Sequence, residues 1–298
     1  MPQFKLKDYA PSIQLYSKYT TFSDYMANKE EVLNDLLDFL LKEKNDRKIK
    51  IPLNYPDKRR LLRGLLNVRQ PRFLPHTILE KIDVLLQIEL KEKSVIEVEQ
   101  LNTVRDLVSN NLFNQSDKFI LWQGDISLLQ TDAIVNAANK YLLGCFQPLH
   151  SCIDNAIHSV AGPLLREDCK TIISIQDRVE KTGDAKITRG YNLPANFVLH
   201  TVGPIVEKGT KLTNKQKEDL ASCYSSCLEL ANQIPDIKSL AFCAISTGVF
   251  GFPKQEAARV AVETVNDWLN LNPHHFEKIV FNVYSEEDYN VYFRLFQQ

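Results

Sequence analysis

The chain has 298 residues, of which 44% are hydrophobic and 24% are charged, which is the balance of an ordinary folded globular protein. Its formal net charge is −1, so we expect neither a nucleic-acid surface nor attraction to a membrane, and an anionic ligand must be bound by local geometry. No apolar stretch approaches the roughly 18 residues of a membrane helix, and none at the start has signal-peptide length, so we expect a soluble, cytoplasmic, monomeric protein.

Residues 1–112 are predicted to form an N-terminal helical region. Residues 28–44 and 77–93 carry leucine and isoleucine at helical spacing. Between them, Asp57 predicts the start of another helix, and the prolines at 71 and 75 interrupt the pattern that follows. Residues 95–112 are expected to be helical as well and to lead into the second part of the chain.

Several cations cluster on the second of these predicted helices: Lys58, Arg59, Arg60, Arg63 and Arg69. They are consistent with a site for an anion or a partner, but also with a solvated helix face, which is the commoner meaning of such a run. Neither a repeat nor a low-complexity linker separates the two parts of the chain. We therefore expect the helical region to pack against the part that follows.

Residues 113–298 alternate between short apolar runs and helical patterns. Strands are predicted over residues 119–122, 133–135, 185–188, 197–202, 240–245 and 279–284, and helices over residues 215–234, 254–269 and 286–296. This alternation predicts a three-layer α/β/α fold. Ligands in such folds bind at the carboxyl ends of the strands, so the residues that follow each strand are the candidates for a site.

Two polar segments directly follow predicted strands. Gly124 permits a tight turn, and Asp125 can accept a hydrogen bond from an exocyclic amine such as that of adenine; an ordinary strand-to-loop turn is the alternative. Asn136 and Asn139 end the next strand. Asn139 can donate to and accept from ribose hydroxyls, whereas both amides could instead cap loops, and we interpret Asn136 as structural in that sense.

A glycine-containing loop, residues 246–253, lies between the predicted strand 240–245 and a helix that starts near Pro253. Successive main-chain N–H groups in such a loop can bind an anion, and the following helix N-terminus favours a phosphate. Phe250 could stack on a ribose or a base. A generic turn is the alternative interpretation.

Two cysteines and a histidine lie within eight residues, namely Cys145, His150 and Cys152. Thiolates and imidazole are the ligands that zinc prefers, and three protein ligands leave a fourth position open, as in catalytic zinc sites. The spacing is not that of a zinc finger, so an incidental loop is the alternative. The remaining cysteines are expected to be buried thiols: Cys169, Cys223, Cys227 and Cys243.

Together these segments resemble the macrodomain family, whose members bind ADP-ribose. The resemblance covers residues 118–296 and is carried by residues 124–126, 132–139, 157–158, 161–165, 184–188, 200–204 and 246–253. Where hydrolytic macrodomains have a run of glycines after the asparagine segment, this chain has Cys145, His150 and Cys152. In this it is similar to a zinc-dependent microbial branch that also has an N-terminal helical region, whose characteristic stretch residues 60–69 resemble.

The resemblance implies a macrodomain with a mixed central sheet over residues 113–298, preceded by the helical region at 1–112. It implies a zinc-dependent hydrolase that removes mono-ADP-ribose from modified proteins, with an acidic side chain as the expected linkage. Three alternatives stay open: a reader that binds ADP-ribose without cutting it, a hydrolase of a small ADP-ribose derivative, and a purely structural zinc ion.

The resemblance also assigns roles to residues. Asp125 and Ile126 are expected to meet the adenine, and Ile153 and Asp154 to border the cleavage site. Asn139 is expected to meet the distal ribose and, with Asp154, to be catalytic, while His158 is interpreted as structural. The loop expected to wrap the diphosphate and the distal ribose consists of Ser246, Thr247, Gly248, Val249 and Phe250.

Overall fold

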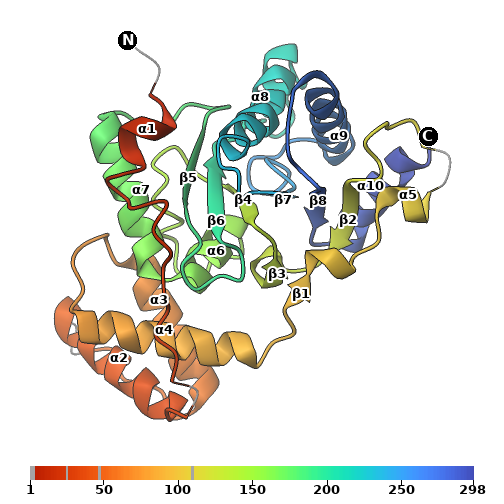
Figure 1. Cartoon of the computed structure of the whole chain (residues 1–298). Coiled ribbons are helices and arrows are strands. Elements are labelled where there is room, and N and C mark those ends of the chain that lie inside the picture. Colours follow the sequence, from red (N-terminus) through yellow and green to blue (C-terminus); the bar gives the residue numbers. More distant parts are fainter. Residues whose placement is uncertain (1–3, 25, 46–47, 109–110) are drawn as a thin grey trace.

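The computed structural model describes residues 4–24, 26–45, 48–108 and 111–298. A six-stranded sheet in the order β2-β8-β7-β4-β6-β5 forms the centre of the molecule (Figure 1). All neighbouring strands are parallel except β5, which runs antiparallel to β6 at one edge, so the predicted mixed sheet is confirmed. The strands are β2 (Phe119–Gln123), β4 (Ala133–Ala137), β5 (Ala185–Arg189), β6 (Phe197–Thr201), β7 (Ser239–Cys243) and β8 (Lys278–Val283).

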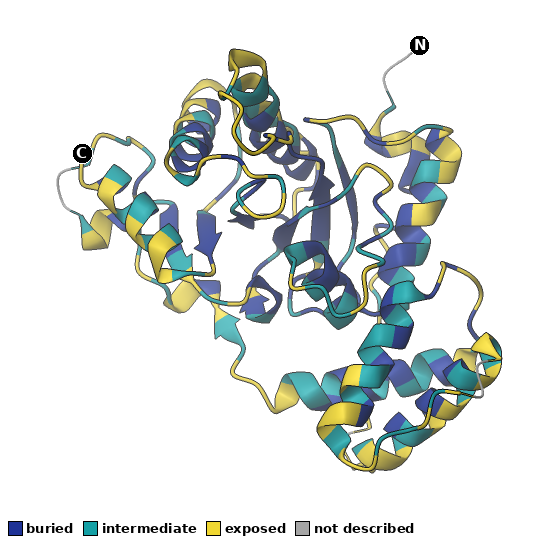
Figure 2. Cartoon of the chain, turned by 180° about the vertical axis from the view of Figure 1, so that it is seen from behind, coloured by how far each residue is buried: buried dark blue, intermediate teal, exposed yellow. Residues whose placement is uncertain are grey.

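Helices cover both faces of this sheet. The central strands are buried on both sides, as Figure 2 shows in dark blue, which requires a layer of helices on each face. α8 packs against α9, and α10 packs against α9 and β2, whereas α6 lies against β4 and α7 against β5. These helices are α6 (Ile153–Ala161), α7 (Pro163–Gln176), α8 (Asn214–Ala231), α9 (Lys254–Leu271) and α10 (Glu286–Phe296).

The N-terminal helices have a small hydrophobic core of their own. α2 (Lys29–Lys44), α3 (Tyr55–Val68) and α4 (His76–Lys91) bury leucines and isoleucines against one another, below the sheet in the view of Figure 1. The Asn28 side chain caps α2. The side chain of Asn54, rather than the predicted Asp57, caps α3, because Asp57 already lies inside the first turn, where it suits the helix dipole.

The first described residues pack in the main core with the sheet. α1 (Leu6–Tyr9) and the following Ala10, Ile13 and Leu15 are buried in the main core. The Tyr9 hydroxyl accepts a hydrogen bond of 2.9 Å from the Ile187 N–H of the edge strand β5. The chain therefore contacts the sheet before it forms α2, α3 and α4, and returns to the sheet afterwards.

The prediction of a helix over residues 95–112 is wrong for most of this segment. Residues 109 and 110 lie outside the described residues. The segment contains β1 (Ile96–Glu97), which pairs with β3 (Leu129–Gln130), a 3₁₀ turn, η1 (Val98–Gln100), and one short helix, α5 (Val104–Leu107). Thr103 and Asp106 cap α5, but Val108 is extended and ends it. No helix among the described residues is long and apolar enough to span a membrane.

Candidate active site

The predicted site segments converge at one edge of the sheet. β2, β4 and β7 run in the same direction, so the residues that follow them emerge at the same, carboxyl-terminal edge. Asp125 follows β2, Asn139 lies two residues beyond β4, and Ser246 follows β7. This places the predicted adenine, ribose and diphosphate segments on one side of the molecule.

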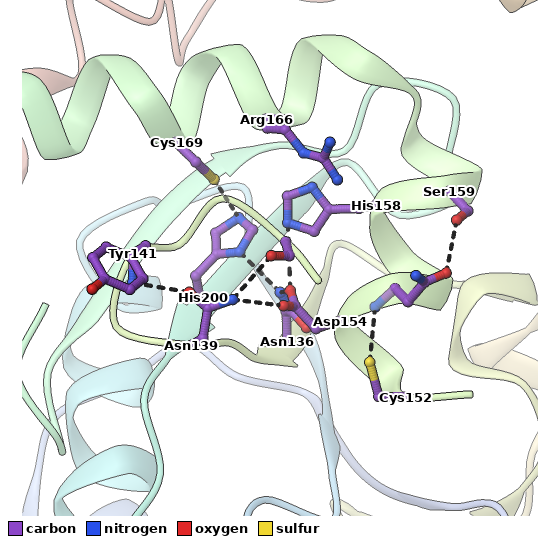
Figure 3. A network of polar contacts seen from close by, with 12 residues as sticks. Asn136, Asn139, Tyr141, Cys152, Asp154, His158, Ser159, Arg166, Cys169 and His200 are labelled. Carbon is purple, nitrogen blue, oxygen red and sulfur yellow. Dashed lines mark hydrogen bonds and ion pairs between the residues drawn. The ribbon is translucent and has the colours of Figure 1, made fainter. Parts of the chain in front are cut away.

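A buried carboxylate, Asp154, lies at the centre of this region (Figure 3). Asn136 donates from Nδ2 to Asp154 Oδ1 at 2.8 Å, and Asn139 donates from Nδ2 to Oδ2 at 3.2 Å. The Asn139 amide also donates to the Gly144 carbonyl oxygen and accepts from the Tyr141 N–H. These contacts fix the orientation of both amides, and through them that of the carboxylate.

Asn136 connects this carboxylate to a second buried group, so its amide contacts buried side chains instead of capping a loop as the sequence predicted. Its Nδ2 lies 3.2 Å from His200 Nδ1, and His200 Nε2 lies 3.0 Å from the Thr188 hydroxyl. Burial lowers the pKa of His200 to about 3, so its ring is neutral. An amide donor at Nδ1 then places the ring hydrogen on Nε2, where the Thr188 oxygen can accept it.

Burial also sets the protonation of the groups that surround Asp154. It raises the pKa of Asp154 to about 6, against the opposing effects of Asn136, the charge of Arg166 and Asn139. His158 Nε2 lies 3.5 Å from Asp154 Oδ1, but burial lowers the pKa of His158 well below its ordinary value, so this is not a charged pair. The carboxylate is therefore ionised near neutral pH and can still accept a proton.

The three residues predicted to bind a metal do lie together. The Cys145 Sγ, a ring nitrogen of His150 and the Cys152 Sγ lie within 4.8 Å of one another, and Cys145 Sγ is 3.7 Å from His150 Nδ1. Burial raises the pKa of Cys152 to about 11, and the neighbouring Cys145 and Asp154 act in the same direction. A cation is what would hold both sulfurs as thiolates, so the donor set fits a soft divalent ion such as zinc.

A second group, His158, Cys169 and His200, has the same compactness and is fully buried. It could also hold an ion. Both ring nitrogens of His200 already lie within hydrogen-bond distance of Asn136 and Thr188, so an ion there would displace those contacts. Cys169 is buried as predicted, as are Cys223, Cys227 and Cys243.

The loop after β7 leaves several main-chain N–H groups available to a ligand. Ser246 has a φ of 66°, in the left-handed region, and its hydroxyl occupies the space beside Gly203, where a Cβ would lie only 2.0 Å from it. Phe252 N–H closes the loop by donating to the Ser246 carbonyl oxygen. The N–H groups of residues 248–250 have no main-chain acceptor within the described chain, and α9 starts just beyond, which together suit a phosphate.

After β2, one of the two carboxylate oxygens of Asp125 already accepts hydrogen bonds from the protein. Its Oδ1 accepts from the Ser127 N–H and hydroxyl, at 3.0 and 2.7 Å, which leaves Oδ2 for a ligand. The Ile126 side chain is buried in the core, so only its main chain can face a ligand. Ile153, the first residue of α6, is partly buried beside Asp154.

Tyr284, which the sequence analysis did not assign to the site, follows the strand that pairs with β2. Tyr284 follows β8, whose Val283 pairs with Gln123 of β2, and its carbonyl oxygen accepts from the Gln123 side chain at 3.4 Å. Its side chain is 80% exposed. The signal was available, since an aromatic residue ends the predicted strand 279–284 at the same edge of the sheet.

Comparison with known proteins agrees with this geometry. The family described as Macro domain matches residues 135–261. A protein-ADP-ribose hydrolase of Treponema medium is 44% identical over 87% of this chain and 96% of its own length, and one of Staphylococcus aureus (strain MRSA252) is 40% identical over 93% and 98%.

Solved structures agree as well. A Trypanosoma brucei macrodomain in complex with ADP-ribose superposes with a TM-score of 0.58 at 30% identity, over 82% of this chain and 96% of that one. A variant of the Oceanobacillus iheyensis macrodomain with ADPR has a TM-score of 0.54 at 37% identity, over 61% and 94%. By its sheet, its site and these relatives, the chain belongs to the macrodomain family.

Proposed function

We propose that this chain releases ADP-ribose from modified proteins by hydrolysing the bond that joins them, and that a zinc ion held by Cys145, His150 and Cys152 takes part. The two relatives described as protein-ADP-ribose hydrolases support the activity, since they match nearly the whole chain. The observation that carries the proposal is the position of Asp154. It is buried, held by two asparagine amides, and only two residues from the metal-ligating Cys152.

ADP-ribose fits the site in one direction. The adenine lies at the Asp125 end, where the free Oδ2 can accept from its amine and the Tyr284 ring can stack on it. The diphosphate lies on the N–H groups of residues 248–250. The distal ribose then reaches Asn139 and Asp154, which places its anomeric carbon beside the carboxylate.

Asp154 acts as the base. With a pKa of about 6 it is ionised at neutral pH and can take a proton from the water that attacks the anomeric carbon, while the bond from that carbon to the protein oxygen breaks. Asn136 and Asn139 hold the carboxylate in place. We expect the linkage to be to an acidic side chain, because a leaving carboxylate needs no proton, which suits a site whose buried histidines stay neutral.

When bound, zinc would supply a positive charge that orients and polarises the ribose and its phosphate. The chain's own contribution is to place the ligands close to the base. Cys145 and His150 come from the loop that follows Asn139, and Cys152 is the N-cap of α6, on whose first turn Asp154 lies. A shift of α6 would thus move a metal ligand and the base together.

The test is release of ADP-ribose from proteins modified at a defined acidic, serine or arginine side chain. We expect activity on the acidic linkage, a loss of about 100-fold or more in Asp154→Ala, and a loss on chelation or in Cys145→Ala. Asp267→Asn, at an exposed position of α9, is the control. Full activity after chelation and in Cys145→Ala would exclude the zinc part, and unchanged zinc content in His150→Ala would remove His150 from the ligands.

The same assay separates the alternatives. A reader would bind ADP-ribose and release none from any modified protein. A hydrolase of a small ADP-ribose derivative would act on the free derivative and leave modified proteins intact. A structural zinc ion would leave the rate unchanged when it is removed from folded protein.

A further inference from the structure

The segment that carries the metal ligands, residues 144–152, which we call the metal loop, lies directly against α3 of the helical region. Gly64 of α3 faces this loop, since a Cβ at Gly64 would make ordinary van der Waals contact with Pro148 and Leu149, at 4.0 Å from each. Leu149 has a φ of 59°, in the left-handed region, and its N–H donates to Asn67 Oδ1 of α3 at 3.0 Å. Asn67 thus fixes the main chain immediately before the ligand His150.

A second contact from α3 reaches the other end of the loop. Arg63 donates from Nε and Nη2 to Asn155 Oδ1, at 3.2 and 2.7 Å. Asn155 is fully buried. Its Nδ2 donates to the Gln147 carbonyl oxygen at 3.2 Å, and its main-chain N–H points at Cys152 Sγ at 3.4 Å. One guanidinium of α3 therefore holds the amide that joins the middle of the metal loop to the sulfur of its last ligand.

The two contacts are linked to each other. Asn67 Nδ2 donates to the Ser159 hydroxyl at 3.2 Å, and that hydroxyl donates to Asn155 Oδ1, also at 3.2 Å. Figure 3 labels both Ser159 and Cys152 and marks a contact from each with a dashed line. Arg63 and Asn67, one turn apart on α3, thus act on the loop through one connected set of hydrogen bonds.

We propose that Arg63 and Asn67 are positioning residues for the zinc site, so that retention of the ion depends on the helical region. The proposal rests on the proposed function for the identity of the ion. The metal loop contains no helix or strand, and two of its residues, Gly144 and Leu149, have a positive φ. Its ligand geometry is therefore set by contacts from outside the loop, and α3 supplies those at Leu149 and Asn155.

Residues that orient metal ligands strengthen metal binding, because ligands that are already in place need not be ordered when the ion binds. Removal of a group that hydrogen-bonds a metal ligand typically weakens metal binding by about 10- to 100-fold. Arg63 and Asn67 act one contact further away, through Asn155 and Leu149, so we expect an effect near the lower end of that range. The proposal gives a role to Arg63, one of the clustered basic residues that the sequence analysis singled out. Lys58, Arg59 and Arg69 pair with acids within the helical region, whereas Arg63 turns toward the metal loop.

The experiment measures zinc release into a chromogenic chelator from the full chain, for wild type, Arg63→Gln, Asn67→Ala and Asn67→Asp. We expect Arg63→Gln and Asn67→Ala to release zinc about 10-fold faster than wild type. Asn67→Asp keeps the acceptor for the Leu149 N–H but loses the donor to the Ser159 hydroxyl, so its rate should lie between those of wild type and Asn67→Ala. The matched control is Arg59→Gln, which breaks a pair with Glu89 inside the helical region and leaves the loop contacts in place.

Each outcome decides something. If the wild type binds no zinc, the metal part of the proposed function fails. If the wild type binds zinc and all variants release it at the same rate, the positioning role of α3 is wrong while the zinc site stands. If Arg59→Gln releases zinc as fast as Asn67→Ala, the effect is a general loosening of the helical region, and the proposal is overturned. Circular dichroism of each variant confirms that it folds.

Discussion

Arg166 of α7 contacts the end of α3, and we expect its substitution to lower the stability of the fold by a measurable amount. Its Nη1 donates to the carbonyl oxygens of Leu66, Asn67 and Arg69, at 3.1, 3.0 and 2.7 Å. Its guanidinium also lies over the Phe146 ring of the metal loop, 4.6 Å from the centroid. Arg166→Gln removes these contacts and leaves the last carbonyl groups of α3 without their donor.

The size of the effect follows from the number of hydrogens. One Nη1 has two, so the three short contacts amount to about two full hydrogen bonds, and bonds to a charged donor contribute roughly 1.5–3 kcal/mol each. Burial of the guanidinium offsets part of this, since only 7% of the residue is exposed and its Nε has no partner in the described chain. We therefore expect Arg166→Gln to lower the free energy of unfolding by about 3 kcal/mol.

The assay is thermal unfolding at pH 7.5. At roughly 2.1 cal/mol/K per residue, a chain of 298 residues unfolds with an entropy of about 0.6 kcal/mol/K, so a loss of about 3 kcal/mol lowers Tm by about 5 °C. The control is Arg294→Gln, because Arg294 is exposed on α10. If Tm of Arg166→Gln lies within about 1 °C of that control, the contact between α3 and α7 does not stabilise the fold and the reasoning is wrong.

Three further predictions concern the site and the sheet. Tyr284→Ala should weaken ADP-ribose binding about 10-fold in calorimetry, through loss of stacking; an unchanged Kd would remove Tyr284 from the adenine site. Gly190→Ala should destabilise the fold by about 2 kcal/mol or more in urea, because its Cβ would lie 1.9 Å from the Ala195 carbonyl oxygen; an unaltered midpoint would contradict this. The pKa of His200 is about 3 in the folded protein, below its ordinary value of 6.5. The unfolded chain therefore binds a proton at this residue before the folded protein does, and the free energy of unfolding decreases as the pH falls below 6.5. The stability gap between wild type and His200→Gln should therefore narrow by about 1.4 kcal/mol from pH 7.5 to 5.5, and a constant gap would refute the shift.

The parts of this fold that the sequence predicts are those with strong local patterns. The six strands of the main sheet are apolar runs bounded by polar residues, and all are found within a few residues of the prediction. Residues 95–112 failed because their apolar residues are divided among a strand, a turn and a short helix, each held by contacts with distant segments. α6 and α7 are not among the helices that the sequence predicts.

The candidate site divides in the same way. Cys145, His150 and Cys152 could be predicted because all three lie in one short segment, and they do come together. The contacts that surround them could not. Arg63 and Asn155 are 92 residues apart, and nothing in the local sequence around either one indicates the other. The burial that raises the pKa of Asp154 likewise depends on the whole fold and not on its neighbours in the chain.

The path of the chain has a consequence for how α3 meets the metal loop. Residues 6–15, which precede α2 in the chain, pack in the main core, and β1, which follows α4, pairs with β3. The segment that contains α2, α3 and α4 is therefore held to the rest of the molecule at both of its ends. A segment on two tethers keeps a high local concentration near its docking surface, whereas a segment on one linker can swing away. After any transient opening, α3 should therefore return to the metal loop faster than a segment on a single linker would.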